Sequence, residues 1–286
     1  MEVRPRAMSD PGTGASGAGR RLDSALAERG IARSRTHAAR LIADGSVTVD
    51  GVTAFKASLR VRDEQVIAVT ASDHYVSRAA HKLIAALDAF GVDPGGRVVI
   101  DAGASTGGFS QVLLERGAAH VLAIDVGHGQ LASEIQDNGA LTMIEGFNIR
   151  DITGEWLRSQ LHGPEFPTLV VGDLSFISLR TVLPPLVGAV GTDADYVLLV
   201  KPQFEVGRTG IREGIVHDGG LRVDAISGVL WAAWDLGLGT AGVISSPIAG
   251  NAGNLEYLVW LSAAGGSNPT EWTDRVNTLA FPKAQH

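Results

Sequence analysis

The chain has no cysteine, only three methionines and few aromatic residues, which make up 6% of its 286 positions. Without cysteine it can form no disulfide bond and no thiolate-bound metal site, and nothing else in the sequence requires a metal. No apolar run reaches the roughly 18 residues that a membrane-spanning helix needs. The first residues carry Arg4 and Arg6 but no apolar segment, so we expect no secretory signal peptide. These absences favour a soluble, cytoplasmic globular protein.

The length and the charge pattern predict two domains. A chain of 286 residues is long enough for more than one hydrophobic core. The net charge of −7 would by itself argue against a nucleic-acid partner. Residues 20–62, however, hold nine lysines and arginines against four acidic residues, so this segment carries +5 and residues 63–286 carry −12. The sequence therefore predicts a small basic module joined to a larger acidic one.

The basic module is predicted to span residues 20–70, after a disordered tail at 1–19 that is rich in Gly, Ser, Pro and Ala. We expect two short helices, the second over 35–43 after a capping Ser34, and then a hairpin at Asp50-Gly51. Cations around the second helix and after the hairpin have few acidic neighbours, which favours a phosphate-binding surface over an ordinary solvated face. The candidate RNA-binding residues of this module are Arg21, Arg33, Arg35, Arg40, Lys56, Arg60 and Arg62.

This segment resembles the S4 RNA-binding domain. The sequence segments that carry the resemblance are 21–23, 30–35, 45–47 and 49–51, and the resemblance covers most of residues 21–68. It implies binding of structured RNA through the second helix and the adjoining loop.

Residues 78–264 alternate predicted strands and helices, between a linker at 71–77 and a C-terminal tail at 265–286. This tail is polar and interrupted by Gly and Pro, so we expect it to be frayed. The alternation of strands and helices indicates an open α/β sheet with right-handed crossovers. The expected parallel strands are residues 98–101, 120–124, 141–144, 168–173 and 194–201. Residues 242–244 and 255–261 are expected to close the sheet as an antiparallel hairpin, which is typical of S-adenosylmethionine (SAM)-dependent methyltransferases. The predicted fold is therefore a Rossmann-like α/β methyltransferase sheet preceded by a small α+β domain.

The methyltransferase prediction centres on the glycine-rich turn at 101–109, between the first strand and a helix. Glycines let the backbone approach a ligand closely, and the helix N–H groups face the turn. A second strand ends in Asp125, where a carboxylate can hold ribose hydroxyls, and Asn148 follows the third strand, where an adenine edge can be read. The turn reads D-x-G-x-S-x-G-G rather than G-x-G-x-x-G, which favours SAM over a dinucleotide, although a merely tight turn is the simpler alternative. The candidate cofactor-binding residues are Asp101, Gly103, Ser105, Thr106, Gly107, Phe109, Asp125, Val126, Asn148 and Asp173.

Four charged residues are expected to converge at the carboxyl ends of the strands, namely Lys82, Asp173, Lys201 and Glu256. A lysine that closes an apolar strand is costly to bury unless it is paired or used. Methylation of a ribose hydroxyl needs a general base stronger than a carboxylate yet neutral near pH 7. We expect Lys201 to be this general base, because burial, a second lysine and a sulfonium all disfavour its ammonium form. Asp173 is expected to orient the Lys201 amine. A non-catalytic ion pair between Lys201 and Asp173 is the alternative.

Five collinear motifs, at 101–109, 125–131, 173–178, 200–205 and 253–257, resemble the TlyA family. These proteins are S4-fused relatives of the FtsJ-type rRNA 2′-O-methyltransferases, and some members are called haemolysins. The resemblance runs from about residue 20 to 262 and implies a K-D-K-E set on Lys82, Asp173, Lys201 and Glu256. It also implies SAM as cofactor, ribosomal RNA in ribosomal subunits as partner and cytidine 2′-hydroxyls as substrate.

Three further interpretations stay open at this point. Phe176 either stacks on a nucleotide flipped out of structured RNA or is buried in the core. A membrane-active haemolysin is a second possible function, although the sequence has no amphipathic or spanning segment beyond ordinary core helices. A non-catalytic ribosome assembly factor that only binds RNA and SAM is a third.

Overall fold

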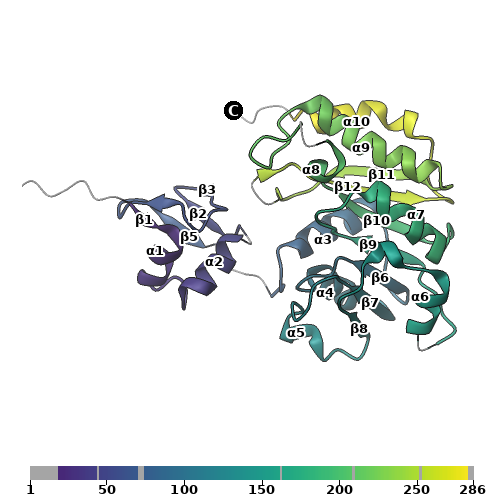
Figure 1. Ribbon diagram of the computed structural model, residues 1–286, viewed down its shortest axis with the longest axis horizontal. Helices are drawn as coiled ribbons and strands as arrows, with labels where there is room; N and C mark the ends of the chain where they lie inside the picture. The colour runs from purple at the N-terminus through teal and green to yellow at the C-terminus, as the bar shows by residue number, and fades with distance from the viewer. Residues whose placement is uncertain are drawn as a thin grey trace, which may run out of the picture. The chain divides into compact units, whose positions relative to one another are not determined.

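The computed structural model describes residues 19–43, 45–69, 74–161, 163–207, 210–250 and 253–282. The tail predicted for 1–19 therefore lies, apart from Gly19, outside the described residues. The chain divides into two compact units, Met1–Ser72 and Asp73–His286 (Figure 1). This division falls within the linker predicted for 71–77, of which 71–73 lie outside the described residues.

The first unit is a small α+β domain. Its helices are α1 (Leu22–Glu28) and α2 (Arg35–Ala43), and its strands are β1 (Arg20–Arg21), β2 (Val47–Val49), β3 (Val52–Thr53), β4 (Arg60–Val61) and β5 (Ile67–Val69). Strands β3, β2 and β5 form an antiparallel sheet, and β1 pairs with β4. Asp50 and Gly51 take positive φ values of 51° and 81°, as a two-residue hairpin turn requires, so the predicted hairpin is confirmed. Apolar residues of both helices and of β2 form one small core.

The second unit is built on a seven-stranded sheet in the order β11-β12-β10-β9-β6-β7-β8. Its strands are β6 (Val98–Ala102), β7 (His120–Ile124), β8 (Leu141–Ile144), β9 (Leu169–Gly172), β10 (Asp195–Val200), β11 (Gly239–Ser245) and β12 (Tyr257–Ser262). The five strands from β8 to β10 are parallel, whereas β12 runs antiparallel between β10 and β11. The predicted fold is confirmed, with one refinement, because β12 lies inside the sheet and β11 forms its edge.

Helices cover both faces of this sheet (Figure 1). The longer helices are α3 (Ala79–Phe90), α4 (Gly108–Glu115), α6 (Gly154–Gln160), α7 (Leu179–Val190), α9 (Gly219–Trp234) and α10 (Thr273–Ala280). Shorter elements are α5 (Ser133–Gln136), η1 (Ile149–Asp151), α8 (Pro202–Glu205) and η4 (Pro269–Trp272). Val99 belongs to the core under α3 and α4, and the next residue, Ile100, belongs to the core under α6, α7, α9 and α10. Successive side chains of β6 thus enter opposite faces, as expected for a central strand that is buried on both sides.

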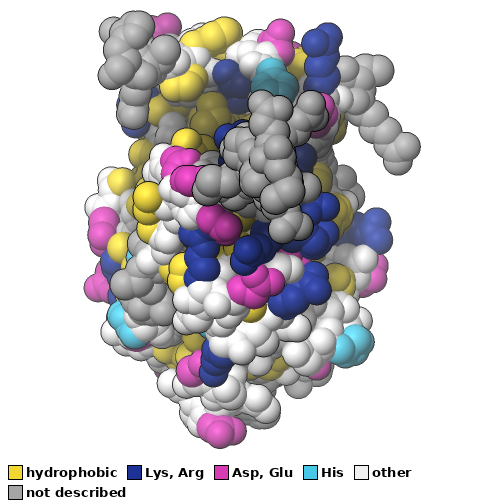
Figure 2. Space-filling model, turned by 90° about the vertical axis from the view of Figure 1, so that its left-hand side faces the viewer, with side chains coloured by type: hydrophobic (Ala, Val, Ile, Leu, Met, Phe, Trp, Pro, Cys, Tyr) yellow, Lys and Arg dark blue, Asp and Glu magenta, His cyan; other side chains and the backbone are white. Residues whose placement is uncertain are grey.

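One face of the molecule carries a mixture of charged, polar and hydrophobic side chains (Figure 2). On the face shown in Figure 2, acidic and basic side chains are interspersed, and hydrophobic side chains form only scattered patches. The apolar residues of the central strands lie in the internal cores and not on this surface.

The C-terminal residues are not the frayed tail that the sequence predicted for 265–286. Asn268 and Glu271 form a capping box at η4, and α10 follows directly. Val276 of α10 is 1% exposed and belongs to the main core. Arg222 of α9 donates from Nε and Nη2 to the carbonyl of Ala280, at 3.0 and 2.7 Å. The Gly and Pro residues that suggested an irregular end instead lead into a packed helix, and residues 283–286 lie outside the described part.

Candidate active site

Four charged side chains from separate elements meet at the carboxyl end of the parallel strands. Lys82 lies on α3, Asp173 directly follows β9, Lys201 directly follows β10, and Glu256 directly precedes β12. Lys82 Nζ lies 2.7 Å from Glu256 Oε2 and 3.5 Å from Asp173 Oδ2. Lys201 Nζ lies 2.6 Å from Asp173 Oδ1. The structure thus brings the four predicted residues together as one alternating chain, Glu256–Lys82–Asp173–Lys201, and their catalytic roles stay predictions.

Strand register explains why these residues meet. Val200 pairs with Tyr257, so Lys201 and Glu256 leave neighbouring antiparallel strands at the same edge of the sheet. The carboxylate of Glu256 also needs the open space beside Gly250, because a Cβ on that glycine would overlap Glu256 Oε1. Leu198 pairs with Gly172, which brings the ends of β9 and β10 close together.

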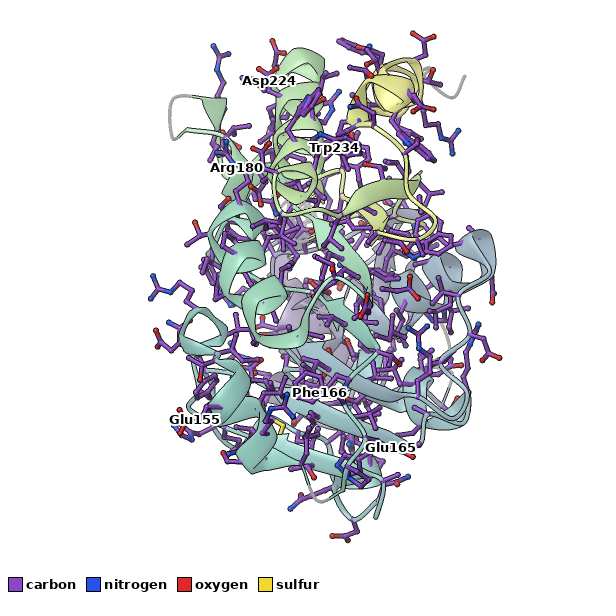
Figure 3. The ribbon with its side chains drawn as sticks, turned by 90° about the vertical axis from the view of Figure 1, so that its right-hand side faces the viewer. Glu155, Glu165, Phe166, Arg180, Asp224 and Trp234 are labelled. Carbon is purple, nitrogen blue, oxygen red and sulfur yellow. The ribbon has the colours of Figure 1, made fainter. Side chains whose placement is uncertain are left out.

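A buried glutamate fastens the two loops that carry Asp173 and Lys201. Glu205, at the end of α8, accepts hydrogen bonds from Ser178 Oγ at 2.6 Å and from the backbone N–H of Leu179 at 2.7 Å. Arg180, labelled in Figure 3, donates from Nη2 to the carbonyl of Glu205 at 3.2 Å. Burial raises the pKa of the Glu205 carboxyl, an effect that these donors oppose. The loop at 173–178 is therefore tied to the segment at 201–205.

The charges of Lys82 and Asp173 depend on each other. Burial alone would lower the pKa of Lys82, but the carboxylates of Asp173 and Glu256 outweigh it and raise that pKa above its ordinary value. Burial alone would raise the pKa of Asp173, but Lys82 and Lys201 hold it below its ordinary value. At neutral pH Lys82 is therefore an ammonium and Asp173 a carboxylate. Lys82 fits the role of a fixed positive charge, which leaves Lys201 as the candidate base.

A cavity of about 520 Å³ opens at the carboxyl ends of β6, β7, β8 and β9, within the roughly 300–1,000 Å³ typical of small-molecule sites. Of the predicted cofactor-binding residues, its walls include Gly103, Ser105, Asp125, Val126, Asn148 and Asp173. Sequence reasoning did not assign to the cofactor site the wall residues Ile124, Gln130, Phe147, Ile149, Arg150, Leu174, Ser175 and Ile177. Phe147 and Arg150 flank Asn148, so their place after β8 was a usable signal.

The glycine-rich turn and Asp125 form one rigid wall of this cavity. Ser105 N–H donates to Asp125 Oδ2 at 2.8 Å, and Gly127 N–H donates to Oδ1 at 2.7 Å. Each carboxylate oxygen keeps a second lone pair for a ligand hydroxyl, so the pair fits a ribose diol. Gly103 has a φ of 82°, and a Cβ there would come within 3.1 Å of the Asp173 carbonyl, so the turn needs glycine at this position. These observations fit the nucleoside part of SAM.

Four predicted cofactor-binding residues do not line this cavity: Asp101, Thr106, Gly107 and Phe109. Asp101 and Phe109 are buried, and Asp101 Oδ2 accepts a hydrogen bond from Ser110 Oγ at 2.6 Å. Gly107 has a φ of 90°, and a Cβ there would overlap Ile135 Cδ1. These residues shape the turn from behind, and direct contact with a cofactor stays a prediction for them.

Asp101→Asn should change how stability depends on pH. Burial raises the pKa of Asp101 to about 7, from about 4 in an unfolded chain. The folded state keeps a proton that the unfolded state has lost in this range, so the free energy of unfolding falls as the pH rises from about 4 through about 7. In urea unfolding the variant should gain about 2–3 kcal/mol relative to the unchanged protein between pH 5 and pH 8. Asp137→Asn, at an exposed acid, is the control; the same pH dependence in Asp101→Asn as in the control would contradict the assignment.

Phe176 stands at the rim of the cavity and is not buried in the core. Its side chain is 91% exposed, and its backbone adopts a left-handed φ of 64°. The ring centroid lies 5.3 Å from that of Phe204. Burial, one of the two alternatives from the sequence, is therefore wrong. An exposed ring held on a strained backbone is available to stack on a base.

The cations predicted to bind RNA in the first unit fall into two groups. Arg21 and Arg35 both bind the buried carboxylate of Asp23, at 3.0 and 3.1 Å. The Arg21 guanidinium and, after the opposing effect of burial, Arg35 hold the pKa of Asp23 far below its usual range. Arg60 donates to the carbonyl of Gly19 at 2.8 Å. Arg33, Lys56 and Arg62 are exposed, and no hydrogen bond or ion pair of the described residues uses their side chains, whereas Arg35 and Arg60 are exposed but already paired. The side chain of Arg40 lies outside the described residues.

Comparison with known proteins gives matches over both units. Residues 75–263 match the FtsJ-like methyltransferase family, and residues 20–67 match the S4 domain. The chain is 48% identical over 244 residues to the 16S/23S rRNA (cytidine-2′-O)-methyltransferase TlyA of Mycobacterium tuberculosis, covering 84% of this chain and 89% of that protein. It is 36% identical over 239 residues to Hemolysin A of Brachyspira hyodysenteriae, covering 83% and 98%. A solved structure from Streptococcus thermophilus with a provisional hemolysin name matches with a TM-score of 0.70 and 32% identity, over 92% of this chain and 96% of that one.

Among the helices of the described residues, none combines the length and the hydropathy needed to cross a membrane.

Proposed function

The chain belongs to the FtsJ-like methyltransferase family, and from that premise we propose that it methylates the 2′-hydroxyl of a cytidine in ribosomal RNA. The observation that carries this proposal is the row of alternating charged side chains Glu256–Lys82–Asp173–Lys201. This row holds the Lys201 amine next to Asp173, which lines the cofactor cavity. The name of the Mycobacterium tuberculosis relative supports cytidine and ribosomal RNA, and with them a cytoplasmic site of action.

The residues of the cavity are suited to SAM, whose sulfonium supplies an electrophilic methyl group. Asp125, fixed by two backbone N–H groups, would accept the ribose hydroxyls. Asn148 Oδ1 accepts the backbone N–H of Arg150 at 3.2 Å, which leaves its Nδ2 to donate to the adenine. Asp173 lines the same cavity and belongs to the charged chain, so it connects the cofactor site with Lys201.

Lys201 acts as the general base in this proposal. Its neutral amine would accept the proton of the 2′-hydroxyl as that oxygen attacks the methyl group that bound SAM would supply. The positive charge lost by the sulfonium would thereby reappear on Lys201 Nζ, so the total charge beside Asp173 would not change. Asp173 stabilises the new ammonium at 2.6 Å, and Lys82, held as an ammonium by Glu256, keeps Asp173 ionised.

The first unit and Phe176 supply the contacts to RNA. Arg33, Lys56 and Arg62 are exposed and free to approach phosphates, which give affinity without reading sequence. Reaching a ribose inside structured RNA requires local unstacking, and the exposed ring of Phe176 can replace the lost stacking partner.

The proposal is tested by locating the transferred methyl group. Ribosomal RNA is incubated with the protein and methyl-labelled SAM and then hydrolysed in alkali, which needs a free 2′-hydroxyl at each cleaved linkage. We expect the label in alkali-resistant dinucleotides with cytidine on the 5′ side. Label in a base would overturn the proposal. Tight SAM binding without activity on any RNA would favour the assembly factor, and lysis of cells by purified protein would favour the haemolysin.

Arg33→Ala should weaken RNA binding about equally for all sequences. Loss of one phosphate contact is expected to reduce the slope of log K against log salt concentration by about one. Arg33→Lys, which keeps the charge, should retain most of that slope. Filter binding between 50 and 200 mM salt measures it. Arg116→Ala, which removes a charge paired with Asp88 in the second unit, is the matched control; equal slopes for the Arg33 and Arg116 variants would contradict the assignment.

A further inference from the structure

Lys201 has a second partner beside Asp173. Its Nζ donates to Ser175 Oγ at 2.8 Å while lying 2.6 Å from Asp173 Oδ1. Ser175 and Asp173 also line the cofactor cavity, and Lys201 directly follows β10. The amine therefore has a hydrogen-bond acceptor, Ser175, and an ion-pair partner, Asp173, on the loop that follows β9.

The two contacts restrict where the lone pair of a neutral amine points. A neutral lysine has two N–H bonds and one lone pair, arranged about the Cε–Nζ bond in three staggered positions. The N–H donated to Ser175 takes one position, so the lone pair is confined to the other two. Of these, the position on the side of Asp173 is disfavoured, because the lone pair and the carboxylate oxygen repel each other when Nζ lies 2.6 Å from Oδ1.

We propose that Ser175 is a positioning residue that, together with Asp173, fixes the rotation of the Lys201 amine so that its lone pair faces the substrate hydroxyl. This inference rests on the proposed function, because only an amine that accepts a proton needs its lone pair aimed. Ser175 acts through Lys201 and takes no proton itself.

The loop that carries Ser175 is held firmly enough for this role. Glu205 binds Ser178 Oγ and the N–H of Leu179, three and four positions after Ser175. Phe176 takes a left-handed φ and its ring lies against Phe204, which belongs to the segment after Lys201. The Ser175 hydroxyl and the Lys201 amine are thus attached to a common rigid unit.

The test compares single-turnover methylation rates of Ser175→Ala, Ser175→Thr and the unchanged protein at saturating SAM. In Ser175→Ala we expect the plateau rate to fall about 10- to 100-fold, because the base is no longer aimed. We also expect the Tm to stay unchanged. Ser175→Thr keeps the hydroxyl and should restore most of the rate. Ser133→Ala, at an exposed serine whose Oγ contacts Glu134, is the matched control and should behave as the unchanged protein.

Two outcomes would overturn the inference. One is an unchanged rate in Ser175→Ala. The other is a rate that falls together with the Tm in Ser175→Ala and is not restored by threonine, which would indicate a merely structural role. The position of the label in the RNA methylated by the unchanged protein distinguishes failure of the proposed function from failure of this inference. Label in a base contradicts the proposed function itself. Label in ribose, together with an unchanged rate in Ser175→Ala, contradicts only this inference.

Discussion

Lys201→Ala is expected to lose methyl transfer by a factor of about 10²–10⁴ while it still folds and binds SAM. The reason is that a ribose hydroxyl must lose its proton as it attacks, and Lys201 is the proposed acceptor of that proton. Lys82, the other lysine of the site, is fixed as an ammonium and cannot take its place. Single-turnover rates on ribosomal RNA measure the loss, and isothermal titration with SAM checks the cofactor site.

Lys201→Arg separates a base from a mere positive charge. Arginine keeps the charge and can still pair with Asp173, but it does not lose its proton in proteins. We therefore expect this variant to be nearly as inactive as Lys201→Ala. Activity close to that of the unchanged protein would indicate that position 201 needs only a cation, which contradicts the general-base assignment.

Lys82→Met is expected to destabilise the protein by about 3–5 kcal/mol. The side chain of Glu256 is only 2% exposed, and Lys82 is its partner at 2.7 Å, so the substitution leaves a buried carboxylate without its cation. Urea unfolding at pH 7 measures the change in the free energy of unfolding. Methyl transfer should also fall, because Asp173 loses one of the two lysines that hold its pKa low.

The double variant Lys82→Met with Glu256→Gln tests the physical reason for this loss. Without the buried charge, the double variant should be more stable than the sum of the two single losses predicts. Arg116→Ala, which breaks an exposed pair with Asp88, should cost less than about 1 kcal/mol and serves as the control. Strictly additive losses in the double variant would mean that Lys82 and Glu256 are not coupled.

The sequence was sufficient for those parts of the molecule that follow from strand composition. Fully apolar runs predicted the parallel strands, and the carboxyl ends of parallel strands meet at one edge, which is why Lys201 and Asp173 could be placed together. The position of Glu256 does not follow from composition in the same way. Glu256 lies in the site because Val200 pairs with Tyr257, and no local sequence pattern specifies this register.

The features that the sequence did not reveal have a common physical origin in contacts between distant residues. The C-terminal helix α10 is held by Val276 in the core and by Arg222, which lies on α9, so its own sequence resembles an irregular tail. Asp101 belongs to β6, all of whose residues are buried, and its carboxyl accepts a hydrogen bond from Ser110 and does not line the cavity, so its contact with a cofactor stays a prediction. Ser175 was passed over because its contact with Lys201 depends on a loop that contains a left-handed Phe176.

Chemical rescue of Lys201→Ala by small primary amines tests the central claim most directly. If an amine at position 201 takes the proton of the ribose hydroxyl, added ethylamine should restore ribose methylation in proportion to the concentration of its neutral form. Tetramethylammonium at the same ionic strength has no lone pair and should restore nothing. Equal restoration by both compounds, or a full rate in Lys201→Ala without any amine, would contradict the account.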